Sequence, residues 1–377
     1  MSIPFNRAVS AGREIEYIRE AVNRGHLAGD GPFTERCQDW LTDFIGVPAA
    51  LLTHSCTAAL EMAAILVGIG AGDEVLMPSF TFVSTANAVV LRGGTPVFVD
   101  IRQDTLNIDD ELIEAAITPR TKAIFPIHYA GVPAEMDRVI ELAKGHNLMV
   151  VEDAAQALGS KYRGRNAGAL AHMAAFSFHE TKNIISGEGG ALAINDKALI
   201  ERAEIIREKG TNRKKFFRGQ VDKYTWVDLG SSFLPSELVA AFLFAQLEQI
   251  DTIQKDRIAI WNMYDAALNP FHSRGVRTPA IPSHCRHNAH MYYVIMPSLE
   301  LRQELIGRLK ADGITAPFHY VPLHSAPAAR RFARTSGQMV QTDDLSARLV
   351  RLPLYPQMGD AACRVRDRVV SHLDQLL

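Results

Sequence analysis

Short apolar and β-branched runs alternate with longer amphipathic stretches over about residues 50 to 210, and this alternation strongly constrains the fold. The runs have the length of buried strands, and the stretches between them carry apolar residues three and four positions apart, as amphipathic helices do. Strands that alternate with helices indicate a mainly parallel sheet covered by helices on both faces. The sequence therefore predicts an α/β fold, in which ligands bind at the carboxyl ends of the strands.

The same periodicity assigns elements to residue ranges. Strands are predicted at residues 74–77, 96–101, 121–127, 148–152, 174–178 and 191–195, and helices at 57–67, 134–146 and 196–209. A long helix from residue 237 to about 264 is expected to lead out of a large domain, residues 1–245. A strand at 291–296 and a helix at 299–312 then indicate a smaller C-terminal α/β domain, residues 246–377.

The composition is typical of a globular two-domain protein. The 377 residues are too many for one ordinary core, and 47% are hydrophobic and 22% charged. A formal net charge of −2 favours neither nucleic acid nor an acidic membrane surface as a partner. No apolar run has the length of a membrane span, no secretory signal is visible, and the four cysteines show neither disulfide nor zinc spacing. We therefore expect a cytoplasmic protein.

A carboxylate follows the predicted strand at 148–152. Asp153 is expected at the ligand-binding edge of the sheet, where a buried carboxylate needs a partner. One interpretation is that Asp153 caps a following helix, and the motif alone favours this interpretation. The other is that Asp153 faces the protonated nitrogen of a bound pyridine ring and keeps that nitrogen charged.

A lysine follows the predicted strand at 174–178. Lys182 is expected at the same edge of the sheet as Asp153. A lysine held there is desolvated, which lowers its pKa and lets it act as an imine-forming amine; a solvated loop lysine is the alternative. The glycines at 187, 189 and 190 allow the backbone to approach a ligand or a neighbouring strand.

The segment 53–60 has the pattern of an anion site. It joins a strand to a helix whose first turn offers free N–H groups, and Ser55 and Thr57 add hydroxyls. A simple helix N-cap is the alternative explanation of these residues. The chain has neither a Walker A loop nor a Gly-x-Gly-x-x-Gly fingerprint, so binding of a nucleoside triphosphate or a dinucleotide is not favoured.

The three segments together match the requirements of pyridoxal 5′-phosphate. That cofactor needs a phosphate site, an acid for its ring nitrogen and an amine for its aldehyde. Phe82, which follows the strand at 74–77, could stack on the ring, with ordinary core packing as the alternative.

These segments resemble the DegT/DnrJ/EryC1/StrS family, fold-type I aminotransferases that act on nucleotide-linked keto sugars. The resemblance runs from residue 29 to residue 354 and rests on the segments 55–60, 78–87, 126–131, 152–156, 177–183, 187–190 and 319–324. The segments 178–183 and 205–226 are most similar to members that use glutamate to aminate C4 of dTDP-4-keto-6-deoxyglucose, giving dTDP-4-amino-4,6-dideoxygalactose. The resemblance implies that reaction, pyridoxal 5′-phosphate as cofactor, and a homodimer with shared active sites.

The resemblance also implies roles for individual residues. Lys182 would form the imine with the cofactor, and Asp153 would pair with the ring nitrogen. The other implied cofactor contacts are Cys56, Thr57, Phe82, Gln156 and Ser177. The expected substrate contacts are His319 and Tyr320, which belong to a family motif, and Lys209 and Arg213 from the basic run 209–218. For most of that basic run, a solvated face is the alternative.

Two positions depart from the family pattern. Cys56 stands where the family usually has glycine or alanine, which leaves less room but keeps the amide donor. Leu234 stands where many members have an asparagine or arginine that reaches the neighbouring subunit's phosphate. Ser231 and Ser232 are candidates to replace that contact.

Other interpretations remain open at this stage. A family branch that dehydrates the sugar has histidine in place of the imine lysine, and Lys182 argues against it. A cofactor-binding regulator on the same fold would normally add a DNA-binding segment, and no basic helix-turn-helix stretch flanks this domain. His284, His287 and His290 recur at every third residue, but a polar loop is favoured over a metal site because zinc ligands have other spacings. The apolar helix at 238–247 could form the dimer surface or lie inside the monomer.

Overall fold

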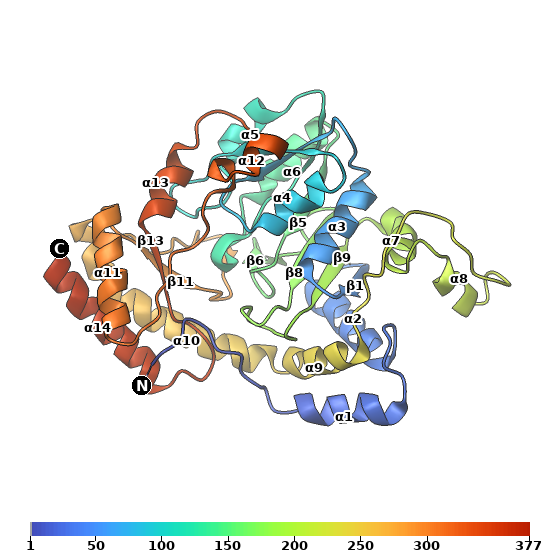
Figure 1. The fold of residues 1–377 in the computed structure, drawn as a ribbon, viewed down its shortest axis with the longest axis horizontal. Helices are drawn as coiled ribbons and strands as arrows, with labels where there is room; N and C mark the ends of the chain where they lie inside the picture. The colour runs from blue at the N-terminus through green and yellow to red at the C-terminus, as the bar shows by residue number, and fades with distance from the viewer. Residues whose placement is uncertain (1) are drawn as a thin grey trace.

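The computed structural model describes residues 2–377, and an eight-stranded sheet lies at its centre (Figure 1). Its strands are, in spatial order, β1 (Ala49–Thr53), β9 (Gly190–Ile194), β8 (Met173–Ser177), β5 (Met149–Asp153), β4 (Thr121–Ile124), β2 (Glu74–Pro78), β3 (Thr95–Val99) and β12 (Arg334–Thr335). Only β9 runs opposite to the others, because it pairs antiparallel with both β1 and β8. The predicted mainly parallel α/β sheet is thus confirmed, and the carboxyl ends of its other strands meet at one edge.

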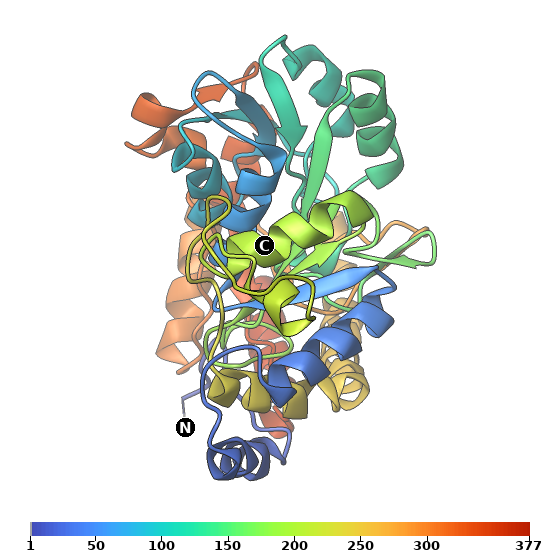
Figure 2. The same cartoon turned by 90° about the vertical axis from the view of Figure 1, so that its right-hand side faces the viewer.

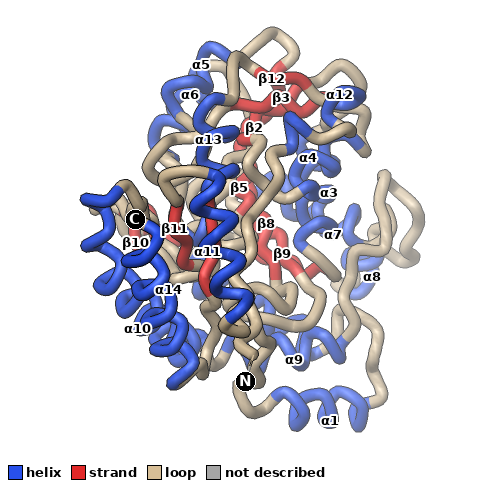
Figure 3. The backbone as a smooth tube through the Cα atoms, turned by 60° about the vertical axis from the view of Figure 1, so that its left-hand side comes forward, coloured by secondary structure: helices blue, strands red, loops and turns tan. Residues whose placement is uncertain are grey.

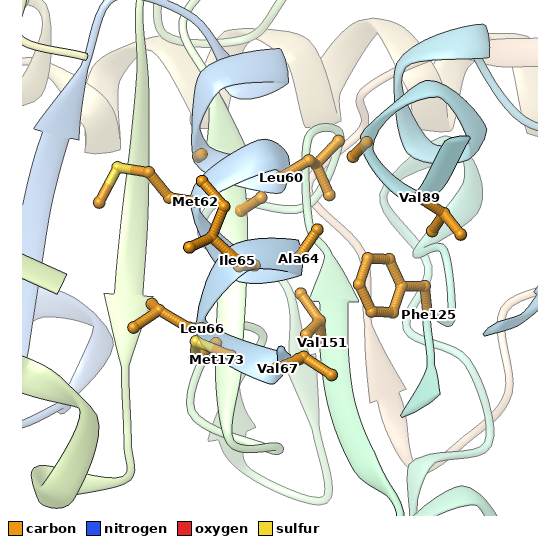
Figure 4. Packing of buried hydrophobic residues seen from close by; sticks show 14 of the residues in the cluster. Leu60, Met62, Ala64, Ile65, Leu66, Val67, Val89, Phe125, Val151 and Met173 are labelled. Carbon is orange, nitrogen blue, oxygen red and sulfur yellow. The ribbon is translucent and has the colours of Figure 1, made fainter. Parts of the chain in front are cut away.

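Alternate strand residues point to opposite faces of the sheet, and helices cover both faces. The helices on one face are α3 (Cys56–Val67), α4 (Val83–Val90) and α7 (Ile200–Arg207). Figure 4 shows how Leu66 and Val67 of α3 pack against Met173 and Val151 of the strands. Because α3 is buried along most of its length, its sequence is apolar on nearly every side.

The opposite face is covered in two places. At the β1 end lie α1 (Glu14–Arg24), α2 (Pro32–Ile45) and α9 (Glu237–Leu247), and at the β3 end lie α5 (Asp110–Ala116) and α6 (Met136–Gly145). A short helix, α8 (Arg213–Phe217), belongs to a segment that extends outward from the body beside α7, and Figure 2 views the molecule from this side.

The C-terminal part of the chain has a separate core around a two-stranded sheet. The antiparallel strands β11 (Tyr292–Ile295) and β13 (Leu349–Leu352) pack against α10 (Ile250–Leu268), α11 (Leu299–Ala311) and α14 (Asp360–Leu376) (Figure 3). The remaining strands and α-helices are β6 (Lys161–Tyr162), β7 (Arg165–Asn166), β10 (Cys285–Arg286), α12 (Ala329–Phe332) and α13 (Val340–Arg348). The division into domains at 245/246 stays a prediction, and this boundary falls inside α9.

Two segments connect the two cores besides α10. β12 comes from the C-terminal part, yet it joins the edge of the main sheet beside β3. The first residues of the chain take the opposite course, because Ile3 packs in the C-terminal core and exchanges backbone hydrogen bonds with Gly313 and Thr315. Asn6 then donates a 2.9 Å hydrogen bond to the carbonyl of Glu180 in the main-sheet part.

The predicted single helix at 237–264 is wrong, because α9 ends at Leu247 and α10 begins at Ile250. The two helices serve different cores: α9 is buried beneath the main sheet, whereas Ile260, Trp261 and Tyr264 of α10 pack in the C-terminal core. Most of α9 is buried within the protomer, as one of the two alternatives for this segment predicts, and its exposed apolar side chain is Leu238. The ends of the other predicted elements differ from the observed ones by at most four residues, the largest difference being at the start of α7 (Ile200–Arg207).

Within residues 2–377, no helix combines the length with the apolar character that crossing a bilayer requires. The cytoplasmic location stays a prediction.

Candidate active site

A cavity of about 790 Å³ lies at the carboxyl edge of the main sheet, where parallel α/β sheets bind their ligands. Loops that follow β1, β2, β5 and β8 form one wall, and the segment 317–321 and β13 contribute to the other. Nine of the eleven predicted site residues line the cavity, namely Cys56, Thr57, Phe82, Asp153, Gln156, Ser177, Lys182, His319 and Tyr320.

Asp153 is the last residue of β5, and its side chain is buried. The hydroxyl of Thr85 donates a 2.6 Å hydrogen bond to Oδ2, and the N–H of Ala155 donates a 3.1 Å bond to Oδ1. Residues 154–160 form turns and not a helix, so the helix-cap interpretation of Asp153 is wrong. Because both of these donors are neutral, the negative charge of the carboxylate is left for a cationic partner in the cavity.

Lys182 lies in the hairpin loop between β8 and β9. The loop is fixed by a 2.8 Å bond from the N–H of Phe178 to the carbonyl of Gly189 and by a 2.9 Å bond from Glu180 to Gly187. Within residues 2–377, no hydrogen bond or ion pair engages the Lys182 amine, which lines the cavity. Burial lowers the pKa of Lys182, which favours the neutral, nucleophilic amine.

The first turn of α3 forms another part of the cavity wall. Ser55 is the N-cap, and its hydroxyl accepts a 3.1 Å hydrogen bond from the N–H of Ala58, so the N-cap interpretation is correct. The capped helix still offers first-turn N–H groups at Cys56 and Thr57, which line the cavity. A Cβ at Gly190 would lie 2.4 Å from the backbone nitrogen of Cys56, so only glycine lets β9 pass this close to the loop.

Aromatic and amide side chains complete the wall. Phe82 is 57% exposed while it lines the cavity, so core packing does not account for it and its ring is open to a planar ligand. Gln156 is fixed at both ends, because its Oε1 accepts from the N–H of Ala130 and its Nε2 donates to the Tyr320 hydroxyl. His319 is held by a 2.7 Å hydrogen bond between its Nδ1 and the Tyr129 hydroxyl.

These groups fit pyridoxal 5′-phosphate. The helix N-terminus with Thr57 and Ser177 suits a phosphate, Asp153 suits a protonated ring nitrogen, and the Lys182 amine suits an aldehyde. When bound, this cofactor supplies a carbonyl for amino groups and an electron sink at the carbon that loses its proton.

The protomer does not bring Lys209 and Arg213 to this cavity. Their cationic groups lie 3.6 and 3.7 Å from the Glu208 carboxylate, beside α7. Lys214 and Arg218 likewise pair with Glu204. Within the protomer, this run is therefore a basic surface, as the alternative of a solvated face predicts. Substrate contact by Lys209 and Arg213 stays a prediction, and it would require the active site of a second subunit.

The three histidines at every third residue have three different surroundings. His284 lies 2.9 Å from Glu135, and His287 packs on the ring of Trp261. Burial lowers the pKa of His287 to about 4. His290 lines the cavity, and its Nδ1 lies 3.0 Å from Oδ1 of Asn183. Among residues 2–377, no group of three or more histidine, cysteine or acidic side chains is arranged to hold a metal ion.

Four cavity or supporting residues were missed by the sequence argument: Thr85, Tyr129, His290 and Arg351. Thr85 and Tyr129 act through hydrogen bonds to side chains that lie far from them in sequence. His290 was noticed only as one of the spaced histidines, and Arg351 lies directly before the 352–354 segment of the resemblance without carrying a motif of its own.

Known proteins match this chain over a range that contains all the predicted site residues. The model of the DegT/DnrJ/EryC1/StrS aminotransferase family matches residues 9–373. The chain is 33% identical to GDP-perosamine synthase from Caulobacter vibrioides, over 97% of this chain and 96% of that protein. It is similar to DesV from S. venezuelae, solved in complex with a ketimine intermediate, with 33% identity, a TM-score of 0.90 and 99% of both chains covered. The PLP-form of Spr1654 from Streptococcus pneumoniae matches with 26% identity, a TM-score of 0.88 and 100% of both chains covered.

Proposed function

Because the chain belongs to the DegT/DnrJ/EryC1/StrS aminotransferase family, we propose that it moves the amino group of glutamate to C4 of dTDP-4-keto-6-deoxyglucose. The product of this reaction is dTDP-4-amino-4,6-dideoxygalactose, and glutamate becomes 2-oxoglutarate. The enzyme is a sugar aminotransferase, and its cofactor is pyridoxal 5′-phosphate. The nucleotide, the reacting carbon and the configuration of the product are proposed from the similarity of the segments 178–183 and 205–226.

The observation that carries the proposal is the placement of Lys182 and Asp153 in one cavity. An amine with a lowered pKa and no partner, together with a buried carboxylate, gives the two groups that amino transfer requires. A cavity of about 790 Å³ has room for a ligand larger than the cofactor alone.

The residues of the chain have distinct tasks in this reaction. The neutral amine of Lys182 takes the proton from Cα of glutamate, and Lys182 later delivers a proton to C4 of the sugar. Asp153 would hold the proton on the ring nitrogen of the bound cofactor, because its negative charge stabilises a cation beside it. Cys56, Thr57 and Ser177 would bind the cofactor phosphate, Phe82 would stack on the ring, and His319 and Tyr320 would contact the sugar.

The reaction is tested with glutamate and a panel of nucleotide-linked keto sugars. We expect amination of dTDP-4-keto-6-deoxyglucose, with the new amine axial at C4 in the NMR spectrum of the product. The free keto sugar should be a poor substrate, since binding energy from the nucleotide helps to hold the reacting carbon in place. An equatorial amine would assign the enzyme to the gluco-forming branch, and no amination of any nucleotide sugar would disprove the proposed function.

Amination of another nucleotide-linked keto sugar is the second candidate. The identity of 33% with GDP-perosamine synthase favours a test of a guanosine-linked keto sugar in the same panel. A cofactor-binding regulator without activity is distinguished by the absorbance spectrum, which glutamate would leave unchanged in such a protein.

We also propose a homodimer with shared active sites. The segment around α8 exposes large aromatic side chains, among them Phe217, Tyr224 and Trp226, the last with 78% of its surface exposed. An exposed apolar patch of this kind favours an interface, and two-fold dimers are the most common assemblies. Light scattering should give twice the chain mass of 41.6 kDa. A fully active monomer at low protein concentration would contradict the dimer.

A further inference from the structure

Asn183 directly follows Lys182 and connects the lysine loop to the turn 288–290, which leads into β11. Its Nδ2 donates a 2.8 Å hydrogen bond to the carbonyl of Asn288, and its Oδ1 lies 3.0 Å from Nδ1 of His290. Because a carbonyl oxygen can only accept, the orientation of the Asn183 amide is settled, and Nδ1 of His290 donates to Oδ1. Asn183 is 5% exposed, so both hydrogen bonds are shielded from water.

The lysine loop is held on two sides by different means. Ile184 anchors it to the main-sheet core by packing. Within residues 2–377, Asn183 is the one side chain of the segment 179–185 that forms hydrogen bonds outside the β8–β9 hairpin. Hydrogen bonds require particular distances and angles, whereas apolar packing is non-directional. The contacts of Asn183 therefore determine the orientation of the loop beside Lys182.

The turn 288–290 is itself fixed by several contacts. The N–H of His290 donates a 3.0 Å hydrogen bond to Oδ1 of Asn288, and Ala289 between them has a left-handed φ of 51°. The buried guanidinium of Arg257 donates to the carbonyls of Ala289 and His290, at 3.1 and 2.6 Å. Asn183 is thus bound to a well-supported part of the C-terminal core.

Asn288 also joins the lysine loop to the loop that carries Asp153. Its Nδ2 donates a 2.9 Å hydrogen bond to the carbonyl of Gln156, in the segment that follows Asp153. Its own carbonyl accepts the hydrogen bond from Asn183, the neighbour of Lys182. One residue of the C-terminal part therefore connects the two loops of the main sheet that carry the amine and the carboxylate.

We propose that Asn183 is a positioning residue for Lys182, because its two hydrogen bonds to the turn 288–290 fix the lysine loop relative to the loop of Asp153. Asn183 is not among the described residues that line the active-site cavity, so it acts through Lys182 and not by contact with a ligand. This proposal rests on the proposed role of Lys182 in amino transfer. Misplacement of a reacting group by about 1 Å can lower a rate by about 10²-fold.

Cofactor binding separates this role from a general role in stability. Pyridoxal 5′-phosphate carries the aldehyde to which the Lys182 amine attaches with loss of water, whereas pyridoxamine 5′-phosphate has an amine in its place and cannot attach. The Kd of each compound is measured by titration of the cofactor-free wild type, Asn183→Ala and Lys182→Ala. In Asn183→Ala we expect the Kd of pyridoxal 5′-phosphate to rise about tenfold, because the freed loop must be ordered on attachment. The Kd of pyridoxamine 5′-phosphate should change less than threefold.

The reaction with glutamate gives a second readout. Single-turnover rates are measured over a range of glutamate concentrations at saturating pyridoxal 5′-phosphate. In Asn183→Ala we expect the maximal rate to fall about ten- to a hundredfold, because Lys182 is misplaced. The half-saturating glutamate concentration should change less than threefold, since Asn183 does not contact the donor. The melting temperature of the cofactor-free protein shows whether the fold is intact.

Substitutions of His290 test one of the two hydrogen bonds from its other end. Asparagine at this position has an amide near the place of Nδ1 and still donates to Asn183, whereas glutamine has its amide near the place of Nε2. The Kd of pyridoxal 5′-phosphate should therefore be closer to wild type in His290→Asn than in His290→Gln. The reverse order would show that His290 acts on a ligand through Nε2, which would overturn its part in positioning Lys182.

Asn195→Ala is the matched control. Nδ2 of Asn195 also donates to a backbone carbonyl, that of Gly168 at 2.9 Å. Asn195 follows β9 at the edge of the sheet opposite the cavity, because the end of β9 pairs with the start of β1. Its substitution should leave both Kd values and the rate with glutamate unchanged.

The outcomes distinguish the proposal from the role of Lys182 on which it rests. Unchanged Kd values and rates in Asn183→Ala, or equal losses with both cofactor forms, would overturn the positioning role alone. If Lys182→Ala binds both forms with the Kd values of wild type, the proposed role of Lys182 fails, and the role of Asn183 fails with it.

Discussion

Lys182→Ala is expected to abolish amino transfer and to leave the fold intact. The substitution removes the amine that moves the proton, and proton transfer by such a group is typically worth about 10²–10⁴ in rate. It also removes the attachment point of the cofactor aldehyde, so the absorbance of the loaded wild type should be missing. Near-normal turnover of a purified, cofactor-loaded Lys182→Ala protein would disprove the assignment of Lys182. Lys144→Ala on the surface of α6 is the control.

The same substitution should not destabilise the protein without cofactor. Folding lowers the pKa of Lys182, so the unfolded chain binds this proton more tightly than the native protein does. The resulting loss of stability is largest below the folded pKa and disappears above the ordinary lysine pKa. The melting temperature of Lys182→Ala should therefore equal or exceed that of wild type at neutral pH, and the difference should vanish in alkaline buffer. A clearly lower melting temperature would indicate a structural role.

Asp153→Asn should slow proton removal from Cα by roughly three orders of magnitude. Two unit charges about 4 Å apart at the dielectric constant typical of protein sites interact by about 4 kcal/mol, and the neutral amide gives up this stabilisation of the ring cation. The fold should survive, because the amide can still accept from Ala155 while the Thr85 hydroxyl turns to accept from it. Single-turnover rates with glutamate, measured with and without deuterium at Cα, report this step.

Thr85→Val separates the two roles of Asp153. It removes one hydrogen bond to the carboxylate but keeps the negative charge, so its rate should stay much closer to wild type. If Asp153→Asn lost stability but kept its specific activity, the carboxylate would serve the architecture and not the reaction.

Much of this site could be predicted from the sequence because the sheet is parallel. The carboxyl ends of parallel strands meet at one edge, so Asp153 after β5 and Lys182 after β8 had to approach one another. The first turn of α3 at Cys56 followed from the same rule. Phe82 remained ambiguous, since the pattern of a strand end does not tell whether a phenylalanine is covered.

Other parts of the structure have no local signal. Arg351 reaches the cavity only because β13 packs beside β11 in the C-terminal core. Thr85 contacts Asp153 only because the order of the strands in the sheet brings these two residues together. The helix breaks before Ile250 because α9 and α10 pack in different cores. The helical periodicity of 237–264 carries no information about the positions of those cores. Lys209 and Arg213 show the converse, because a basic run suggested anion binding while both of these charges lie beside Glu208, directly after α7, in the protomer.

The course of the first residues makes the enzyme vulnerable to proteolysis at one point. Phe5 lines the cavity against Arg351, whereas Arg7, two residues further along the chain, is exposed. A tryptic cut after Arg7 would free a short peptide, whose described residues are held through Ser2, Ile3, Phe5 and Asn6, and would leave every strand of the main sheet uncut. The nicked protein would look native by circular dichroism and by size, but the loss of Phe5 would open the cavity to water beside Arg351. Storage or purification with traces of trypsin would thus produce an apparently intact but impaired enzyme.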